Sequence, residues 1–161
     1  MINFVKESIN EALHTTGYKL TEMSSLKSVF FRQKVWDTFT DGKYHYALWE
    51  SAAEHGGFSV CDANAWKWLD EFLLPNEFYL FFDKGDDSTI YIFPENQSFT
   101  KFQTEFPDYI FYITNENLDF LIYQNDSDYL RCIGTAEPWL RNKVKELSKT
   151  GWVDMEGKSY L

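Results

Sequence analysis

The stretch YIFYITNENLDFLIYQNDSDYLRCIG, residues 109–134, decides the fold class because polar turns divide it into apolar runs. The runs cover residues 109–113, 120–124 and 129–134. They are rich in the aromatic and β-branched residues that favour strands. Residues 115–117 and 125–128 contribute the Asn, Asp and Ser residues that are typical of tight turns. The stretch is therefore predicted to form consecutive antiparallel strands.

A hairpin is expected before these strands. FYLFF at 78–82 and TIYIF at 89–93 flank the turn DKGDDS. Phe99, Phe102 and Phe106 share a helical spacing, which predicts a short crossover helix. Apolar residues point to both faces of these strands, so one face must pack on helices. The other face is either covered as well or left as an aromatic platform.

Helices are expected toward both ends of the chain. An N-terminal helix carries Ile2, Val5, Ile9, Ala12 and Leu13 on one face and stops at Gly17. A second follows Ser24 or Ser25, with Leu26, Val29, Phe30 and Val35 on its buried side. A short strand is expected over residues 44–49. A third helix, capped by Asp62, is expected over residues 62–75. A final helix starts near Glu137 and stops at Gly151.

This order of elements predicts the α+β class. We expect a mainly antiparallel sheet of about five or six strands, packed against N-terminal and C-terminal helices. Residues 1–150 form a single domain in this interpretation, and residues 151–161 form a loosely attached C-terminal tail.

The negative charge is concentrated in the strand-rich half. The net charge is −10, and residues 70–130 hold 13 acidic residues but only two basic ones. A general phosphate-backbone binder needs a basic footprint, so nucleic acid is not expected as a partner. Because turns of a meander gather at the ends of a sheet, the first and third turns are expected to share a negative rim. The residues that this prediction places on the rim are Asp83, Asp86, Asp87, Asp126 and Asp128.

Such a rim beside aromatic strand residues suits a basic protein partner. Tyr91, Tyr112 and Tyr123 are the expected aromatic contacts. The competing interpretation is that acidic turns only keep the protein in solution and block edge-to-edge pairing of sheets.

Motifs for other chemistry are absent from the sequence. It contains no GxGxxG, GxxxxGK[ST], HExxH or GxSxG, and the DKGDDS turn fails the EF-hand spacing, so we expect no cofactor and no metal. Cys61 and Cys132 lack zinc-site spacing, and no segment reads as a secretory signal or a membrane span. A cytoplasmic protein with reduced thiols is expected, with a Cys61–Cys132 disulfide as the alternative. A nucleophile–base pair of Cys61 and His55 is the alternative that would make the chain an enzyme.

The segment FYITNENLDFLIYQNDSDYLRCIG, residues 111–134, resembles the strand–turn–strand core of a family of small uncharacterised bacterial proteins. That family has an aromatic FY-[IV]-T strand and a second strand that ends in Gly, and these motifs are not catalytic. In size, acidity and element order the chain also looks like the immunity proteins that neutralise secreted bacterial toxins. That resemblance implies a cytoplasmic protein that occludes a toxin's active site, often a basic nuclease groove. It assigns a role to no particular residue.

These observations predict a non-enzymatic acidic binding protein, of immunity or inhibitor type, that recognises a basic protein partner. The alternatives are a small enzyme with an unrecognised pocket and a structural homo-oligomeric subunit held together by an exposed sheet face.

Overall fold

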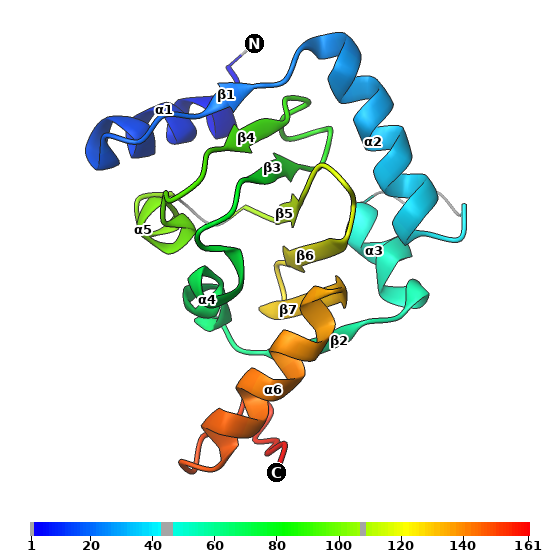
Figure 1. Cartoon of the computed structure of the whole chain (residues 1–161), viewed down its shortest axis with the longest axis vertical. Coiled ribbons are helices and arrows are strands. Elements are labelled where there is room, and N and C mark those ends of the chain that lie inside the picture. Colours follow the sequence, from blue (N-terminus) through cyan, green and yellow to red (C-terminus); the bar gives the residue numbers. More distant parts are fainter. Residues whose placement is uncertain (1, 43–46, 107–108) are drawn as a thin grey trace.

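The computed structural model describes residues 2–42, 47–106 and 109–161. These residues form a single seven-stranded sheet between two layers of helices (Figure 1). The strands are β1 (Thr21–Glu22), β2 (Phe58–Cys61), β3 (Phe78–Phe82), β4 (Tyr91–Phe93), β5 (Phe111–Thr114), β6 (Phe120–Gln124) and β7 (Tyr129–Gly134). Their order across the sheet is β1-β4-β3-β5-β6-β7-β2, and all neighbours are antiparallel. The predicted α+β class is confirmed.

The strand count exceeds the prediction because of the two edge strands, β1 and β2. Thr21 and Glu22 pair with β4, yet both side chains are exposed, so no apolar pattern marks them. Strand β2 has only four residues and pairs with β7 from Phe58↔Cys132 to Cys61↔Tyr129. Strands this short have weak sequence signals, and short edge strands also limit pairing with other chains.

The helices lie on both faces of the sheet. They are α1 (Phe4–Thr16), α2 (Ser25–Phe39), α3 (Leu48–Ala52), α4 (Asp70–Leu73), α5 (Phe99–Thr104) and α6 (Ala136–Ser148), with the 3₁₀ turns η1 (Ala53–His55) and η2 (Ala65–Trp68). Helices α1, α4, α5 and α6 contribute to the core on one face, and α2 and α3 to the core on the other (Figure 1).

The alternation of side chains in β3 shows why the sheet needs two helical layers. Phe78, Leu80 and Phe82 belong to the first core, whereas Tyr79 and Phe81 belong to the second. All five are buried because successive side chains of a strand point to opposite faces. The alternative of an exposed aromatic platform is therefore wrong.

Helix α2 buries a different stripe from the one expected. Leu26, Val29 and Phe30 are 69%, 62% and 62% exposed, while Ser28 and Val35 are buried. The buried stripe is therefore rotated around the helix from the one we assigned. The prediction is confirmed for Val35 and is wrong for the three earlier apolar positions.

Two other local predictions are corrected. The helix expected over residues 62–75 is replaced by a turn at residues 63–64, then η2, and then α4, with a turn at Leu69 between these two elements. Of the strand expected over residues 44–49, residues 44–46 lie outside the described residues. Leu48 and Trp49 begin helix α3, and Asp83 Oδ1 accepts a hydrogen bond of 3.3 Å from the Leu48 N–H.

The C-terminal segment is anchored rather than loosely attached. Trp152 Nε1 donates a hydrogen bond of 3.2 Å to Asp62 Oδ2, and the Met155 N–H donates one of 2.7 Å to the Cys61 carbonyl. Asp154 is only 5% exposed. Residues 152–161 thus extend the first core and reach the loop that follows β2.

Cys61 and Cys132 are both buried and free. The disulfide alternative is therefore wrong. Among the described residues, no helix has the length and apolar composition needed to cross a membrane.

Candidate binding cavity

Strand pairing brings two distant acidic turns to the same end of the sheet. Phe82 at the end of β3 pairs with Phe111 at the start of β5, and Phe111 also pairs with Gln124 at the end of β6. The turn after β3 and the turn after β6 therefore project from one end. The turn between β5 and β6 projects from the other.

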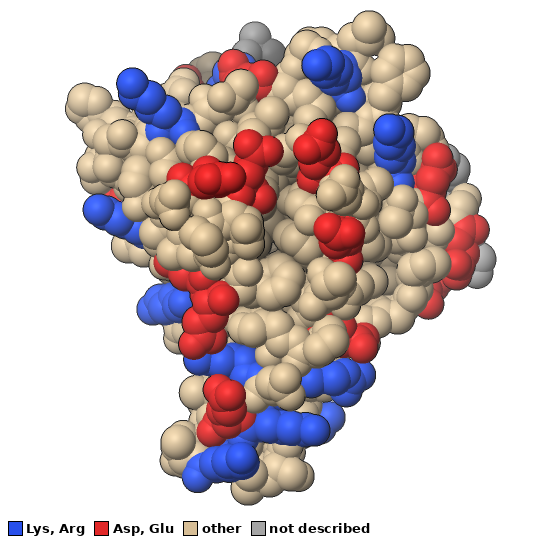
Figure 2. Space-filling view, viewed as in Figure 1, with Lys and Arg blue, Asp and Glu red and all other residues tan. Residues whose placement is uncertain are grey.

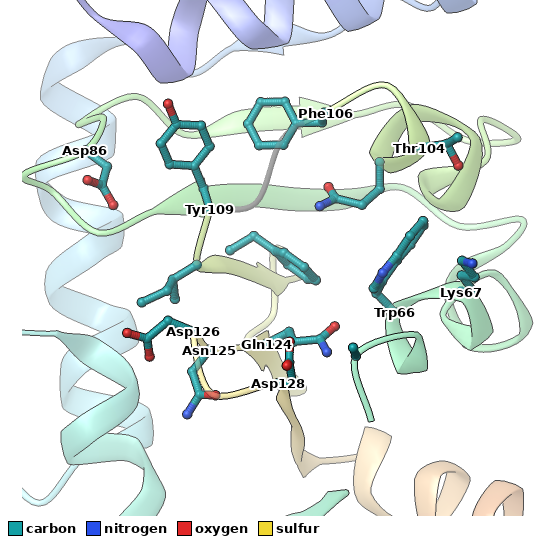
Figure 3. A pocket seen from close by; sticks show the side chains of 14 residues that line it. Trp66, Lys67, Asp86, Thr104, Phe106, Tyr109, Gln124, Asn125, Asp126 and Asp128 are labelled. Carbon is teal, nitrogen blue, oxygen red and sulfur yellow. The ribbon is translucent and has the colours of Figure 1, made fainter. Parts of the chain in front are cut away.

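A cavity of about 680 Å³ lies at the first of these ends (Figure 3). Its lining combines carboxylates, aromatic rings and amides. The lining residues belong to both acidic turns, to η2, to α5 and to the start of β5. The lining residues that matter here are Trp66, Lys67, Asp86, Gln103, Phe106, Tyr109, Gln124, Asp126 and Asp128. Figure 3 shows Asp86 on one side, Trp66 and Lys67 on the other, and Asp126 and Asp128 along the lower edge.

Three of the five aspartates that we singled out lie around this cavity. Asp86 and Asp126 are exposed, and Asp128 is half-buried. Their carboxylates make no hydrogen bond and no ion pair with any residue in the described ranges 2–42, 47–106 and 109–161. They are therefore available to a ligand, and among the described residues of the lining only the Lys67 ammonium opposes their charge.

The other two aspartates stabilise the fold instead. The Asp83 carboxylate accepts a hydrogen bond of 2.8 Å from the Tyr112 hydroxyl, and burial raises the pKa of Asp83. Asp87 is only 3% exposed and accepts hydrogen bonds from the Tyr91 hydroxyl at 2.5 Å and the Thr89 N–H at 3.0 Å. Neither carboxylate borders the cavity.

The three tyrosines that we expected at the surface are buried. Tyr91 belongs to the first core, and Tyr112 and Tyr123 belong to the second. Burial is the largest cause of the raised pKa of each hydroxyl. The aromatic contacts available to a ligand come instead from the half-buried Trp66 and Tyr109.

Asp62 joins the loop that precedes η2 to the end of β6 and the β6–β7 turn. Its N–H donates a hydrogen bond of 3.0 Å to the Asp128 carbonyl, and its own carbonyl accepts one of 3.0 Å from Gln124 Nε2. Gln124 is 7% exposed, and its Oε1 has no hydrogen-bond partner among the described residues. A buried polar atom without a partner is costly, so this oxygen is a candidate acceptor for a ligand.

Helix α5 forms another wall, and Asp70 fixes its position. The Asp70 carboxylate accepts hydrogen bonds from the Ser98 hydroxyl at 2.5 Å and from the Thr100 hydroxyl at 2.6 Å. From this helix Gln103 reaches the cavity lining with 7% exposure, and its amide has no hydrogen bond to the described part of the chain. The ring of Phe106 lies 5.6 Å from that of Tyr109.

Sequence reasoning did not find Trp66, Gln103 or Gln124. Trp66 lies within the helix expected over residues 62–75, and Gln103 lies within the expected crossover helix. Gln124 closes the FLIYQ strand, and a polar residue at the end of a strand is ordinary. The available signal was the proximity of Gln124 to the third acidic turn.

Acidic side chains also occupy the other end of the sheet. Figure 2 shows them on the face that carries the β5–β6 turn, with Lys and Arg gathered at the end formed by α6. Glu77 and Asp119 line a smaller cavity of about 220 Å³ at that end. A test of the larger cavity therefore needs a control that removes charge elsewhere.

Cys61 and His55 do not form the nucleophile–base pair that was the enzymatic alternative. Burial raises the pKa of the Cys61 thiol, whose Sγ lies 3.8 Å from the Ser127 carbonyl. His55 Nδ1 lies 2.9 Å from Asp41 Oδ1 at the surface. Among the described residues, no group of three or more His, Cys, Asp or Glu side chains is arranged to hold a metal ion.

Comparisons of the chain with protein-family models, curated proteins and solved structures give no match.

Proposed function

We propose that this chain is a non-enzymatic, cytoplasmic binding protein that recognises a basic protein partner through the 680 Å³ cavity. The observation that carries the proposal is the position of Asp86, Asp126 and Asp128. They come from two separate turns, border one aromatic-walled cavity, and have no ionic partner among the described residues.

The physical chemistry of the cavity favours a cationic group. Carboxylates around a concave surface focus their field, and this raises the rate of encounter with a positively charged partner. The rings of Trp66 and Tyr109 add faces that attract cations and apolar stems. A net charge of −10 acts in the same direction over a longer distance.

An immunity or inhibitor role is the form of this function that the size and acidity of the chain support. A basic side chain of a toxin that is bound in the cavity can no longer contact the toxin's own substrate. This mode requires no catalytic group in the binding protein. The enzyme alternative receives no support from Cys61 and His55, and the homo-oligomer alternative loses the exposed sheet face on which it depended.

A stopped-flow experiment tests the proposal with a fluorescein-labelled peptide of alternating Gly-Lys and Gly-Arg pairs as the probe. The test variant combines Asp86→Asn, Asp126→Asn and Asp128→Asn. We expect its association rate to fall about tenfold in about 20 mM salt, and the difference to shrink in about 500 mM salt.

The matched control removes the same charge away from the cavity, through Glu95→Gln, Glu116→Gln and Glu146→Gln. All three side chains are exposed, and none lines the 680 Å³ cavity. Its association rate is expected to stay within about twofold of wild type. Equal slowing of the two variants would show that net charge alone acts, and failure of the wild type to bind the probe would also refute the proposal.

A further inference from the structure

We infer that the cavity accepts an arginine side chain of the partner in preference to a lysine side chain. This inference rests on the proposed function and specifies the chemical group that enters. It is drawn from the distribution of acceptors, from the unpartnered Gln124 oxygen and from the aromatic walls.

The acceptors are distributed around the cavity rather than gathered at one point. Asp86 lies across the cavity from Trp66, and Asp126 and Asp128 lie along another edge (Figure 3). A guanidinium group carries five N–H donors in one plane, so it can reach several separated acceptors at once. An ammonium group has its charge and all its donors on a single nitrogen, so it can bind fewer of the separated acceptors at once.

Gln124 supplies an oriented neutral acceptor beside these carboxylates. Its Nε2 donates to the Asp62 carbonyl at 3.0 Å, and a carbonyl oxygen can only accept. That contact fixes which end of the amide is nitrogen and leaves Oε1 on the other side, without a partner among the described residues. Figure 3 shows the Gln124 side chain in the space between Asp128 and Trp66. A donor from a ligand would satisfy this oxygen.

The aromatic walls favour a flat, weakly hydrated cation. Guanidinium stacks on aromatic faces and loses its hydration water at a lower cost than ammonium does. The exposed Lys67 already places its Nζ 5.5 Å from the centre of the Trp66 ring, so a cation at this ring is compatible with the fold. Because Lys67 also repels an entering cation, its removal is expected to increase the affinity of the cavity for a cation.

The test uses NMR titration of the intact protein with three blocked tripeptides that differ only at the central residue. The probes are Ac-Gly-Arg-Gly-NH₂, Ac-Gly-Lys-Gly-NH₂ and the citrulline analogue, which keeps the shape of arginine without its charge. We expect the arginine peptide to bind about fivefold more tightly than the lysine peptide. The citrulline peptide is expected to bind more weakly than both, and the largest shifts should be at the Trp66 indole N–H and the Gln124 amide.

Protein variants separate the individual contacts. Gln124→Met should weaken the arginine peptide about threefold and leave the lysine peptide unchanged, since it removes the neutral acceptor. Lys67→Gln should strengthen both charged peptides. Gln97→Met is the matched control, because Gln97 bonds Lys19 and does not line the cavity. If Gln124→Met is unfolded, a symmetric dimethylarginine peptide tests the same contact on the wild type, since methylation keeps the charge and blocks donors.

The outcomes distinguish this inference from the proposed function. Equal affinity for the arginine and lysine peptides, both lost in the triple Asn variant, would overturn the arginine preference and leave the basic-partner function standing. Absence of binding by either charged peptide, together with failure of the longer probe, would overturn both. Arginine binding that survives in the triple Asn variant would place the site elsewhere and overturn the inference.

Discussion

The Tyr91 hydroxyl donates a hydrogen bond of 2.5 Å to Oδ2 of the buried Asp87, inside the loop that joins β3 to β4. Arg32 approaches the same loop from α2, and its Nη2 donates to the Asp87 carbonyl at 2.9 Å. The loop is therefore held from both faces of the sheet, because Tyr91 lies in the first core and α2 in the layer over the second. Asp86 precedes Asp87, so these contacts also fix where Asp86 meets the cavity.

Tyr91→Phe is expected to lower the free energy of unfolding by about 1–3 kcal/mol, because it leaves a buried carboxylate oxygen without its donor. Urea denaturation followed by circular dichroism measures the change. Tyr109→Phe is the matched control, since no hydrogen bond joins the half-buried Tyr109 hydroxyl to a described residue. Its effect should remain within about 0.5 kcal/mol. Similar losses in both variants would contradict the assigned role of the Tyr91–Asp87 contact.

Gly134→Ala is expected to destabilise the protein by about 2 kcal/mol or more, for two reasons. Gly134 has a φ of 74°, which side chains disfavour, and a Cβ there would lie 2.3 Å from the Asp119 carbonyl oxygen. Gly85→Ala provides the comparison, because a Cβ at Gly85 meets nothing within 4 Å. A melting temperature for Gly134→Ala equal to that of Gly85→Ala would show that the close approach is not constraining.

The sheet was predictable because its central strands have strong local signals. Runs such as FYLFF and FLIYQ, divided by turn residues, predict the strands and their antiparallel hairpins. They do not predict the strand order, in which β3 lies between β4 and β5. The convergence of the turns after β3 and β6 does not follow from chain order, because in a simple meander these two turns would lie at opposite ends of the sheet. It depends on the crossover through α5, which places β5 beside β3 rather than beside β4. Strand β1 has only two residues, both exposed, and β2 (FSVC) lacks the longer apolar run of the central strands, so tertiary pairing defines both.

Side-chain direction within the turns was not predictable. Asp86 and Asp87 are neighbours of the same type, yet Asp86 is exposed at the cavity and Asp87 is buried. Asp87 turns inward because Tyr91 and the Thr89 N–H supply its hydrogen bonds. The unpartnered oxygen of Gln124 likewise depends on the position of the Asp62 carbonyl, which belongs to a distant part of the chain.

Stability is expected to fall between pH 10 and pH 12. The pKa values of Tyr123 and Tyr160 are raised to about 12, mainly by burial, from an ordinary value of 10.0. In this window the unfolded chain loses these protons while the folded chain keeps them, so rising pH favours unfolding. The stabilisation is complete below pH 10 and is lost as the pH approaches 12.

Urea denaturation at a series of pH values, with tyrosinate absorbance as a second signal, measures this decline. Tyr123→Phe removes one of the groups whose pKa is raised and should make the slope shallower by up to about 1.4 kcal/mol per pH unit. The Tyr123 hydroxyl also donates a hydrogen bond of 3.3 Å to the Trp49 carbonyl, so some stability at neutral pH is lost too. An unchanged slope would refute the raised pKa.

Asp154→Ala is expected to lower the free energy of unfolding by about 2–4 kcal/mol, because this buried carboxylate organises the C-terminal segment. Its Oδ1 accepts hydrogen bonds from the N–H groups of Glu156 and Lys158, each at 2.9 Å, and its Oδ2 accepts one of 3.1 Å from the Tyr160 hydroxyl. Chemical denaturation measures the loss. Val153→Ala, at a neighbouring side chain that is 49% exposed, should change stability by no more than about 0.5 kcal/mol. If Asp154→Ala lowered the free energy of unfolding by as little as Val153→Ala, residues 152–161 would be the loosely attached tail that the sequence suggested. In that case the hydrogen bond from Trp152 to Asp62 would not support the cavity.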